Sequence, residues 1–156
     1  MKLLRTLNRL KDPRDLWLFL QILTTLVMLP RRIRRLSLLD LLNRMDPGVG
    51  TGHQDRSKLE KTVGFVDSLL KYRVFRRYGK CLLRSLLLFR FLRRQGWPVE
   101  IHFGVRRTAA EPPADIDPIP NSLGITGHSW LVLNGEPFLE AESHQKNFAT
   151  TFFYPQ

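Results

Sequence analysis

The sequence contains a single cysteine, Cys81, in 156 residues. One cysteine cannot form an internal disulfide, which excludes a disulfide-stapled secreted fold and fits a reducing cytosol. Acidic residues are also scarce: 14 carboxylates face 25 lysines and arginines, which leaves a net charge of +11. A chain of this charge is expected to attract an acidic partner, which could be a peptide, a protein surface, a nucleic acid or an anionic membrane.

The shortage of acid is uneven along the chain. Residues 1–60 carry twelve basic and six acidic side chains, residues 61–107 carry twelve and two, and residues 108–156 carry one and six. The bland alternative is that the basic side chains simply solvate helix surfaces. The stretch "RVFRRYGK" interleaves aromatic and basic residues, but no recognised nucleic-acid motif is present, so we predict no nucleic-acid partner.

A long uninterrupted hydrophobic run is missing as well. The most apolar stretch, residues 16–30, is about fifteen residues long and contains Gln21, Thr24 and Thr25, whereas a membrane-spanning helix needs about twenty. Arginines follow it and no small-residue cleavage site does, so it is not a signal peptide. We predict a buried core helix, with a helix lying on a membrane surface, and hence a weak membrane-surface association, as the alternative.

Two helices are predicted in the first third of the chain. Asp12 can cap the first helix and Pro30 is expected to stop it, so residues 12–29 are predicted to be helical. A second helix is predicted over residues 33–43, where the loop "DPGVGTG" ends it.

Two further helices are predicted before the chain changes character. A third begins near Ser57, with Glu60 three residues later in a capping-box pattern. The fourth opens at Cys81: eight of the eleven residues 82–92 are apolar and lie nearly all round the axis, which predicts a buried helix. Gly96 is a natural residue for its C-terminal end.

Beyond this helix the hydrophobic period changes to two. Apolar and polar residues alternate in "PVEIHFGVR", which predicts a half-buried strand. Residues 108–127 carry four prolines and no periodicity, and are predicted to form a long loop. The stretch "HSWLVLNGEPFLE" then predicts a hairpin around its Asn-Gly pair. Helices followed by an antiparallel sheet indicate an α+β fold, and we predict one domain in which a helical segment, residues 1–60, packs on a core, residues 61–156.

Cys81 is a candidate nucleophile because it lies in the first turn of the fourth predicted helix. The positive end of the helix macrodipole stabilises a thiolate, and unpaired N–H groups there could hold an oxyanion. The alternative is an inert core cysteine. A nucleophile needs a base and the base an orienting acid, and His128 with Glu140 are the candidates. In this arrangement Cys81 attacks a carbonyl carbon, His128 protonates the leaving amine, and water hydrolyses the thioester.

The pairing of His128 with Glu140 depends on the turn of the hairpin. A three-residue loop with a G1 bulge, over residues 133–135, places His128 opposite Glu140, within hydrogen-bonding reach. A two-residue type I′ loop places His128 opposite Ala141 and turns Glu140 to the other face. The catalytic pairing therefore requires the bulged turn, with Glu142 as the reserve acid. Trp130, on the same strand face as His128, is expected either to shield bound substrate or to pack in the core.

These residues carry a resemblance to a known family. The pattern "KCLLRSLLLFRFLRRQGWPVEIHFGV" followed by "GHSWLVLNGEPFLE" resembles the transglutaminase-like cysteine peptidases of lasso-peptide biosynthesis, the B proteins. The resemblance begins near "LKDPRDLWLFL" and runs almost to the C-terminus. The spacing of His128 and Glu140 agrees with the His-to-acid spacing of the family, in which Asp is the more usual acid.

The resemblance implies a cysteine peptidase that removes the leader from a ribosomally synthesised precursor peptide in the bacterial cytoplasm. It implies a stand-alone peptidase subunit that acts with a separate leader-recognition protein and alongside an ATP-dependent lasso cyclase. We expect no cofactor and no metal ion. Two other functions stay open: acyl transfer to an amine by the same triad, and a basic, non-enzymatic module that binds nucleic acid or a membrane surface.

Overall fold

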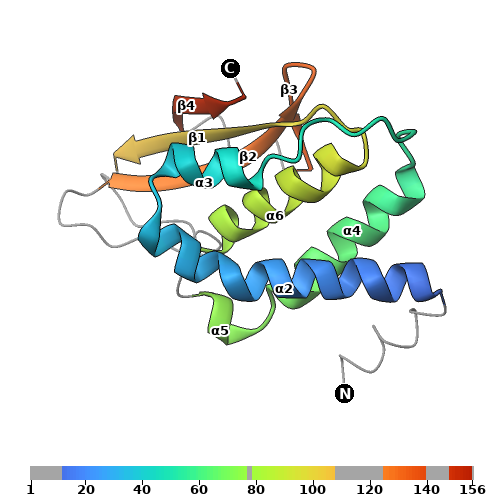
Figure 1. Cartoon of the computed structure of the whole chain (residues 1–156). Coiled ribbons are helices and arrows are strands. Elements are labelled where there is room, and N and C mark those ends of the chain that lie inside the picture. Colours follow the sequence, from blue (N-terminus) through green and yellow to red (C-terminus); the bar gives the residue numbers. More distant parts are fainter. Residues whose placement is uncertain (1–11, 77–78, 108–124, 140–147, 156) are drawn as a thin grey trace.

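The helices of the protein lie on one face of a small antiparallel sheet (Figure 1). The computed structural model describes residues 12–76, 79–107, 125–139 and 148–155. The described helices are α2 (Pro13–Arg35), α3 (Leu38–Met45), α4 (Arg56–Leu69), α5 (Arg73–Arg76) and α6 (Lys80–Arg94). The strands are β1 (Glu100–Arg107), β2 (Ile125–Leu133), β3 (Glu136–Phe138) and β4 (Ala149–Tyr154), in the spatial order β3-β2-β1-β4. Every neighbouring pair of strands is antiparallel, so the predicted α+β class is confirmed.

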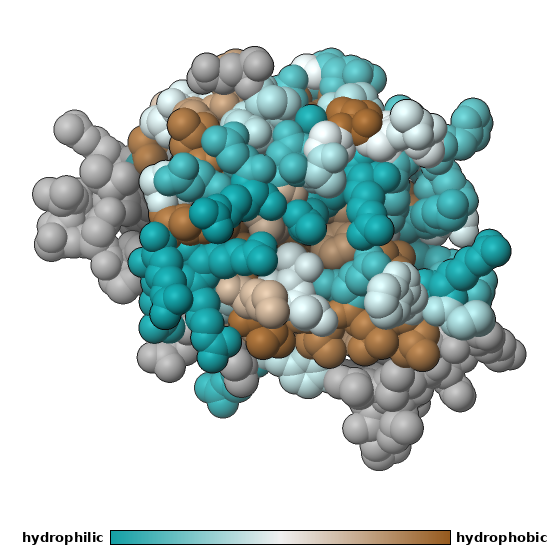
Figure 2. All heavy atoms as spheres, viewed as in Figure 1, coloured by the Kyte–Doolittle hydropathy of each residue, from teal (hydrophilic) through white to brown (hydrophobic). Residues whose placement is uncertain are grey.

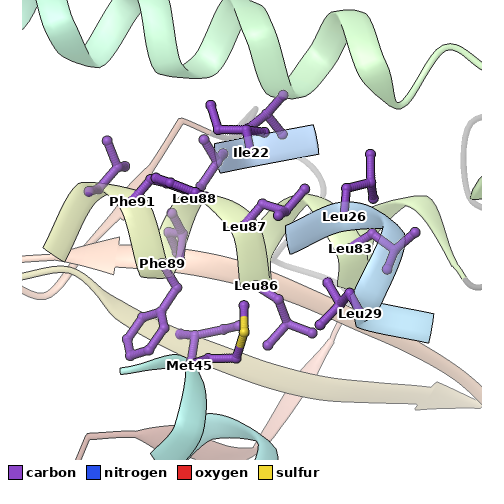
Figure 3. Close-up of a cluster of buried hydrophobic side chains, with 14 of the residues drawn as sticks. Ile22, Leu26, Leu29, Met45, Leu83, Leu86, Leu87, Leu88, Phe89 and Phe91 are labelled. Atoms are coloured by element: carbon purple, nitrogen blue, oxygen red, sulfur yellow. The ribbon is translucent and has the colours of Figure 1, made fainter. Parts of the chain in front are cut away.

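Helix α6 is the centre of the core. It packs on β1 and β2 on one side and on α2, α3 and α4 on its others. In Figure 3, Ile22, Leu26 and Leu29 of α2 lie beside the leucines of α6, and Met45 of α3 lies beside Phe89. The fully buried residues of α6 are Leu83, Leu86, Leu87, Leu88, Phe89 and Leu92. Apolar residues nearly encircle this helix because other elements pack on several of its sides. Each fully buried side chain contributes about 1.5–3 kcal/mol of burial free energy.

The end of α6 follows the predicted glycine signal. Gly96 has φ +89°, in the left-handed region that a side chain disfavours. A Cβ at this position would also lie 2.2 Å from the carbonyl oxygen of Gly52. Gly96 therefore ends the helix and lets the loop before α4 pass directly against it.

The prediction that Pro30 ends the first helix is wrong, because α2 continues through Pro30 to Arg35. A proline inside a helix removes one backbone hydrogen bond. Leu29 and Pro30 are both buried, and this packing offsets the missing bond. Ile33 consequently belongs to α2, and the second predicted helix starts later, after Ser37, whose hydroxyl accepts a hydrogen bond from the Asp40 N–H at 3.1 Å.

The predicted capping box at the third helix is also wrong in detail. The N-cap of α4 is Asp55, whose carboxylate accepts hydrogen bonds from the N–H groups of Ser57 and Lys58. Glu60 pairs instead with Arg56, at 3.6 Å between Nε and Oε1. A carboxylate two residues upstream outcompetes the Ser57 hydroxyl because an ionised acceptor makes the stronger bond to helix N–H groups.

Candidate active site

Cys81 lies in the first turn of α6 and is half-buried. The residue before the helix, Gly79, is buried and has φ +78°. Glycine has no side chain that could cap the helix, so it leaves the first-turn N–H groups of α6 to other partners. The thiol therefore lies where partial positive charge from the helix end is strongest.

His128 lies on β2, where aromatic rings hold its imidazole. The side chain is 8% exposed, and its ring stacks on Trp130 with centroids 5.8 Å apart and contacts Phe148 in a tilted arrangement with centroids 5.1 Å apart. Trp130 is itself buried and packs with Val132 and Phe148, which agrees with the core-packing alternative of its two predicted roles. Gly104 on β1 pairs with His128, and its lack of a side chain leaves space for the Trp130 indole. A Cβ at Gly104 would lie 2.8 Å from the Trp130 ring.

A hydrogen bond ties the cysteine helix to the histidine strand. Ser85 lies one helical turn after Cys81 on the same side of α6. Its hydroxyl donates to the backbone carbonyl of Ser129 at 2.9 Å, and the contact is buried. Ser129 directly follows His128 in the sequence. The pairing of β2 with β3 ends at Leu131, so Ser129 has no partner residue on β3. The second turn of α6 is therefore fixed to the backbone of β2 at the residue that follows His128.

A second anchor joins the same part of α6 to the end of the hairpin. The Arg84 guanidinium donates to the Asp67 carboxylate of α4 at 2.8 Å and to the carbonyl of Leu139 at 3.2 Å. Leu139 directly precedes Glu140 in the sequence. Arg84 and Ser85 thus hold the backbone next to two of the predicted catalytic residues against the helix that Cys81 opens.

Strand alternation divides the side chains of β2 between two faces. Leu131 belongs to the main core under α6. Trp130 and Val132 form a second cluster with Phe148 on the other face, and the stacked ring of His128 lies there too. The hydrogen bond of Ser85 therefore joins the second turn of α6 to the backbone of β2 next to His128, while the imidazole of His128 lies on the second face of the strand with Trp130 and Phe148.

Of the two hairpin registers that the sequence left open, the structure has the type I′ one and not the bulged one that the catalytic pairing required. Leu133 pairs with Glu136, Val132 with Pro137 and Leu131 with Phe138, which leaves only Asn134 and Gly135 in the loop. Both loop residues have positive φ, 53° and 81°, as a type I′ turn requires. The bulged turn that would have placed His128 opposite Glu140 is therefore not formed, because an Asn-Gly pair satisfies the two-residue turn without strain.

The pairing of β2 with β3 does not by itself position the predicted acid. β3 ends at Phe138, and Leu139 has φ 62°, which breaks the extended geometry of the strand. The two acid candidates, Glu140 and Glu142, and also His144, lie outside the described residues. The role of Glu140 in a triad stays a prediction.

The other described histidines have local structural roles or are exposed. His102 contacts Glu100, with 3.0 Å between Nε2 and Oε2, and stacks on Phe153. His53 is exposed in the loop before α4. Among the residues that the structure describes, no group of three or more His, Cys, Asp or Glu side chains could hold a metal ion.

The sequence analysis did not predict the anchoring roles of Arg84, Ser85 and Asp67. A signal was present in the sequence. Arg84 and Ser85 are adjacent polar residues between the apolar residues 82–83 and 86–89 of the predicted helix. A buried polar side chain must find a hydrogen-bond partner, so such a pair indicates a specific contact with a neighbouring element.

The fold and this site define a class: an α+β protein in which a cysteine opens a central helix and a histidine lies on the sheet that packs against it. Residues 23–152, more than half of the chain, match the sequence profile of the transglutaminase-like superfamily. The chain belongs to this superfamily, which is generally enzymatic and includes cysteine peptidases and transglutaminases. No curated protein and no solved structure matches the chain.

Proposed function

We propose that this protein is a cysteine peptidase that removes the leader from a ribosomally synthesised lasso-precursor peptide in the bacterial cytoplasm, together with a separate leader-recognition protein. The observation that carries the proposal is the pair of anchors from α6. Ser85 holds the backbone that follows His128, and Arg84 holds the backbone that precedes Glu140. Both anchors lie within about one turn of Cys81, which supports the proposal that Cys81, His128 and Glu140 act together.

In the proposed reaction Cys81 Sγ first transfers its proton to the imidazole of His128. The thiolate attacks the carbonyl carbon of the leader–core peptide bond, and first-turn N–H groups of α6 stabilise the oxyanion. The C–N bond breaks as His128 protonates the leaving amine, which is the N-terminus of the core peptide. Water, deprotonated by His128, then attacks the thioester and releases the leader carboxylate and the Cys81 thiolate, which the imidazolium reprotonates.

The environment of His128 supports this role. The imidazole of His128 contacts both Trp130 and Phe148 and is 8% exposed, so the neighbouring rings restrict its rotation and limit its contact with bulk water. Glu140 would fix the tautomer and stabilise the imidazolium.

The first experiment follows alkylation of Cys81 by iodoacetamide at about pH 6.5, where an ordinary thiol reacts slowly. We expect rapid modification of the native protein, and a loss of about tenfold or more in His128→Ala. His102→Ala is the matched control, because His102 lies on the same sheet and stacks on an aromatic ring. Equal rates in the native protein and in His128→Ala would contradict the pairing of thiol and imidazole.

The second experiment mixes the protein with a lasso-precursor peptide and the leader-recognition protein encoded with it, and analyses the products by mass spectrometry. We expect a single cut at the leader–core junction, abolished in Cys81→Ala and His128→Ala. Glu140→Ala is expected to weaken cleavage and Glu142→Ala to leave it intact, and the reverse result would make Glu142 the triad acid. Retained cleavage in Cys81→Ala removes the peptidase assignment.

Acyl transfer is the second candidate, because the superfamily includes transglutaminases. This reaction forms the same thioester, but an amine attacks the thioester in place of water. Adding a small primary amine to the same reaction separates the two: a leader that carries the amine indicates transfer, and a free carboxylate indicates hydrolysis.

A further inference from the structure

The outward side of α2 is an exposed apolar surface. Its large exposed side chains are Leu16, Trp17, Leu20, Val27 and Met28, and we name this set the α2 outer face. Their spacing places them on one side of the helix, and Trp17 is 65% exposed. The described residues include eleven exposed large hydrophobic side chains, of which seven lie on α2 and α3. Such a concentration marks an interaction surface rather than scattered surface residues.

The opposite side of α2 is part of the core. Phe19, Ile22, Leu26 and Leu29 are buried where α2 packs on α4 and α6. The sequence-based prediction of a buried core helix is therefore correct for one side only. In the most apolar 18-residue stretch of α2, 22% of the residues are buried. By length and composition α2 could cross a membrane, which on its own is weak evidence. Crossing would remove its buried side from the core, so α2 can meet a membrane only by lying along its surface.

Basic side chains border the α2 outer face. Arg31, Arg34 and Arg35 are exposed at the C-terminal end of the helix. Figure 2 shows the brown apolar band along α2 with a hydrophilic teal group at its end. The sequence from residue 16 to residue 39 contains no acidic residue, and residues 1–11 contain four basic residues and no acid. Positive charge therefore follows the apolar band directly in the sequence, and on its N-terminal side the basic residues of 1–11 precede Asp12 and Asp15.

The arginines near this end are crowded. Arg90 of α6 is partly buried close to Arg32 and Arg94, and burial, followed by these two neighbouring charges, lowers the pKa of its guanidinium. Arg90 donates to the backbone carbonyls of Arg44 and Met45. Like charges held this close repel one another, and an anionic ligand nearby relieves the repulsion.

We propose that the α2 outer face docks on an anionic membrane surface, with α2 lying parallel to the lipid plane. Leu16, Trp17 and Leu20 would enter the boundary between headgroups and acyl chains, where tryptophan is favoured. The exposed arginines at the end of the helix would bind lipid phosphates, which guanidinium groups contact in bidentate fashion. Aliphatic side chains on a convex helix, bordered by arginines, match a fluid lipid surface more closely than the concave pocket of an acidic protein.

This orientation leaves the candidate active site accessible. In Figure 1, α2 lies on one side of α6 and the sheet lies on the other. A membrane against α2 would therefore face away from β2 and His128. The proposal does not depend on the peptidase assignment, since it concerns a different surface.

The test is co-sedimentation of the full chain with vesicles of phosphatidylcholine alone or with about 30% phosphatidylglycerol. We expect binding to the anionic vesicles only. Arg31→Glu/Arg35→Glu should weaken it at least about tenfold, since each basic side chain near an anionic surface contributes substantially to binding. The matched control is Arg56→Glu/Lys58→Glu on α4, which makes the same charge change at exposed residues of another helix.

A second measurement examines the apolar contact directly. Brominated lipids should quench the fluorescence of the bound protein, and Trp17→Phe should remove most of this quenching while binding persists. Trp17→Ser/Leu20→Ser should weaken binding itself, with far-ultraviolet circular dichroism confirming that the variant is folded. Absence of vesicle binding, equal binding to neutral vesicles, or equal weakening by the α2 and α4 charge reversals would each overturn the proposal.

Discussion

The hydroxyl of Ser85 on α6 donates a hydrogen bond to the backbone carbonyl of Ser129 on β2, 2.9 Å away in the buried interior. The contact joins the helix that Cys81 opens to the strand that carries His128. A buried hydroxyl without a hydrogen-bond partner would lower the stability of the fold. The bond to Ser129 satisfies the Ser85 hydroxyl and fixes the helix relative to the strand.

Ser85→Ala is expected to destabilise the fold by about 1–2 kcal/mol, because the Ser129 carbonyl loses a buried partner. We also expect alkylation of Cys81 at about pH 6.5 to slow, since α6 is no longer bonded to the strand that carries His128. Ser57→Ala on the exposed start of α4 is the control for both measurements. A purely structural role would lower the melting temperature and leave the alkylation rate of the folded protein unchanged.

Gly104→Ala should disturb the ring that packs on His128. The new methyl group would lie 2.8 Å from the Trp130 indole and 3.0 Å from the carbonyl of Ala149. Overpacking of this kind costs about 1–3 kcal/mol, which urea unfolding would measure. Gly127→Ala on the adjacent strand is the matched control, because a Cβ there meets nothing within 4 Å. Equal stability of the two variants would contradict the close packing.

Asp46→Ala should be among the most destabilising single changes at the end of α3. Its carboxylate lies 2.8 Å from Arg93 Nε, and the two side chains are only 13% and 10% exposed. Removing the acid leaves the Arg93 charge buried without its partner, which costs about 3–5 kcal/mol. Glu60→Ala, which breaks an exposed pair with Arg56, should change the free energy of unfolding by less than about 1 kcal/mol. A comparable loss in both variants would show that the Arg93 pair is effectively solvated.

Tyr154 should make the protein sensitive to alkaline pH. Burial, followed by the nearby carboxylate of Asp46, raises the pKa of its phenol, whose hydroxyl donates to Asn43 Oδ1 at 2.9 Å. A group with a raised folded-state pKa contributes stability that is present below its unfolded value, about 10, and is lost as the pH rises through the folded value. Tyr154→Phe should therefore flatten the fall of unfolding free energy above about pH 10. Parallel pH profiles for Tyr154→Phe and the native protein would contradict this.

Local sequence signals were sufficient for several features of the fold. The apolar pattern around α6, the glycine that ends it, the change of period to two and the Asn-Gly hairpin all follow from short-range physics. Cys81 in the first turn and His128 on a strand were likewise predictable, although β2 begins at Ile125, within the stretch 108–127 that was predicted to be loop. The sequence by itself thus determined the α+β class and the elements that carry the two central residues of the site.

Tertiary packing decided the features that local signals left open. Pro30 lies within α2 because burial of Leu29 and Pro30 outweighs one missing hydrogen bond. The Asn-Gly pair allows two registers, and the observed one places Phe138 opposite Leu131 and stacked on Trp97 at 5.9 Å. The partners of Ser85 and Arg84 lie 44 and 55 residues away along the chain. Contacts of this kind depend on which buried surfaces meet in three dimensions, and no short stretch of sequence contains that information.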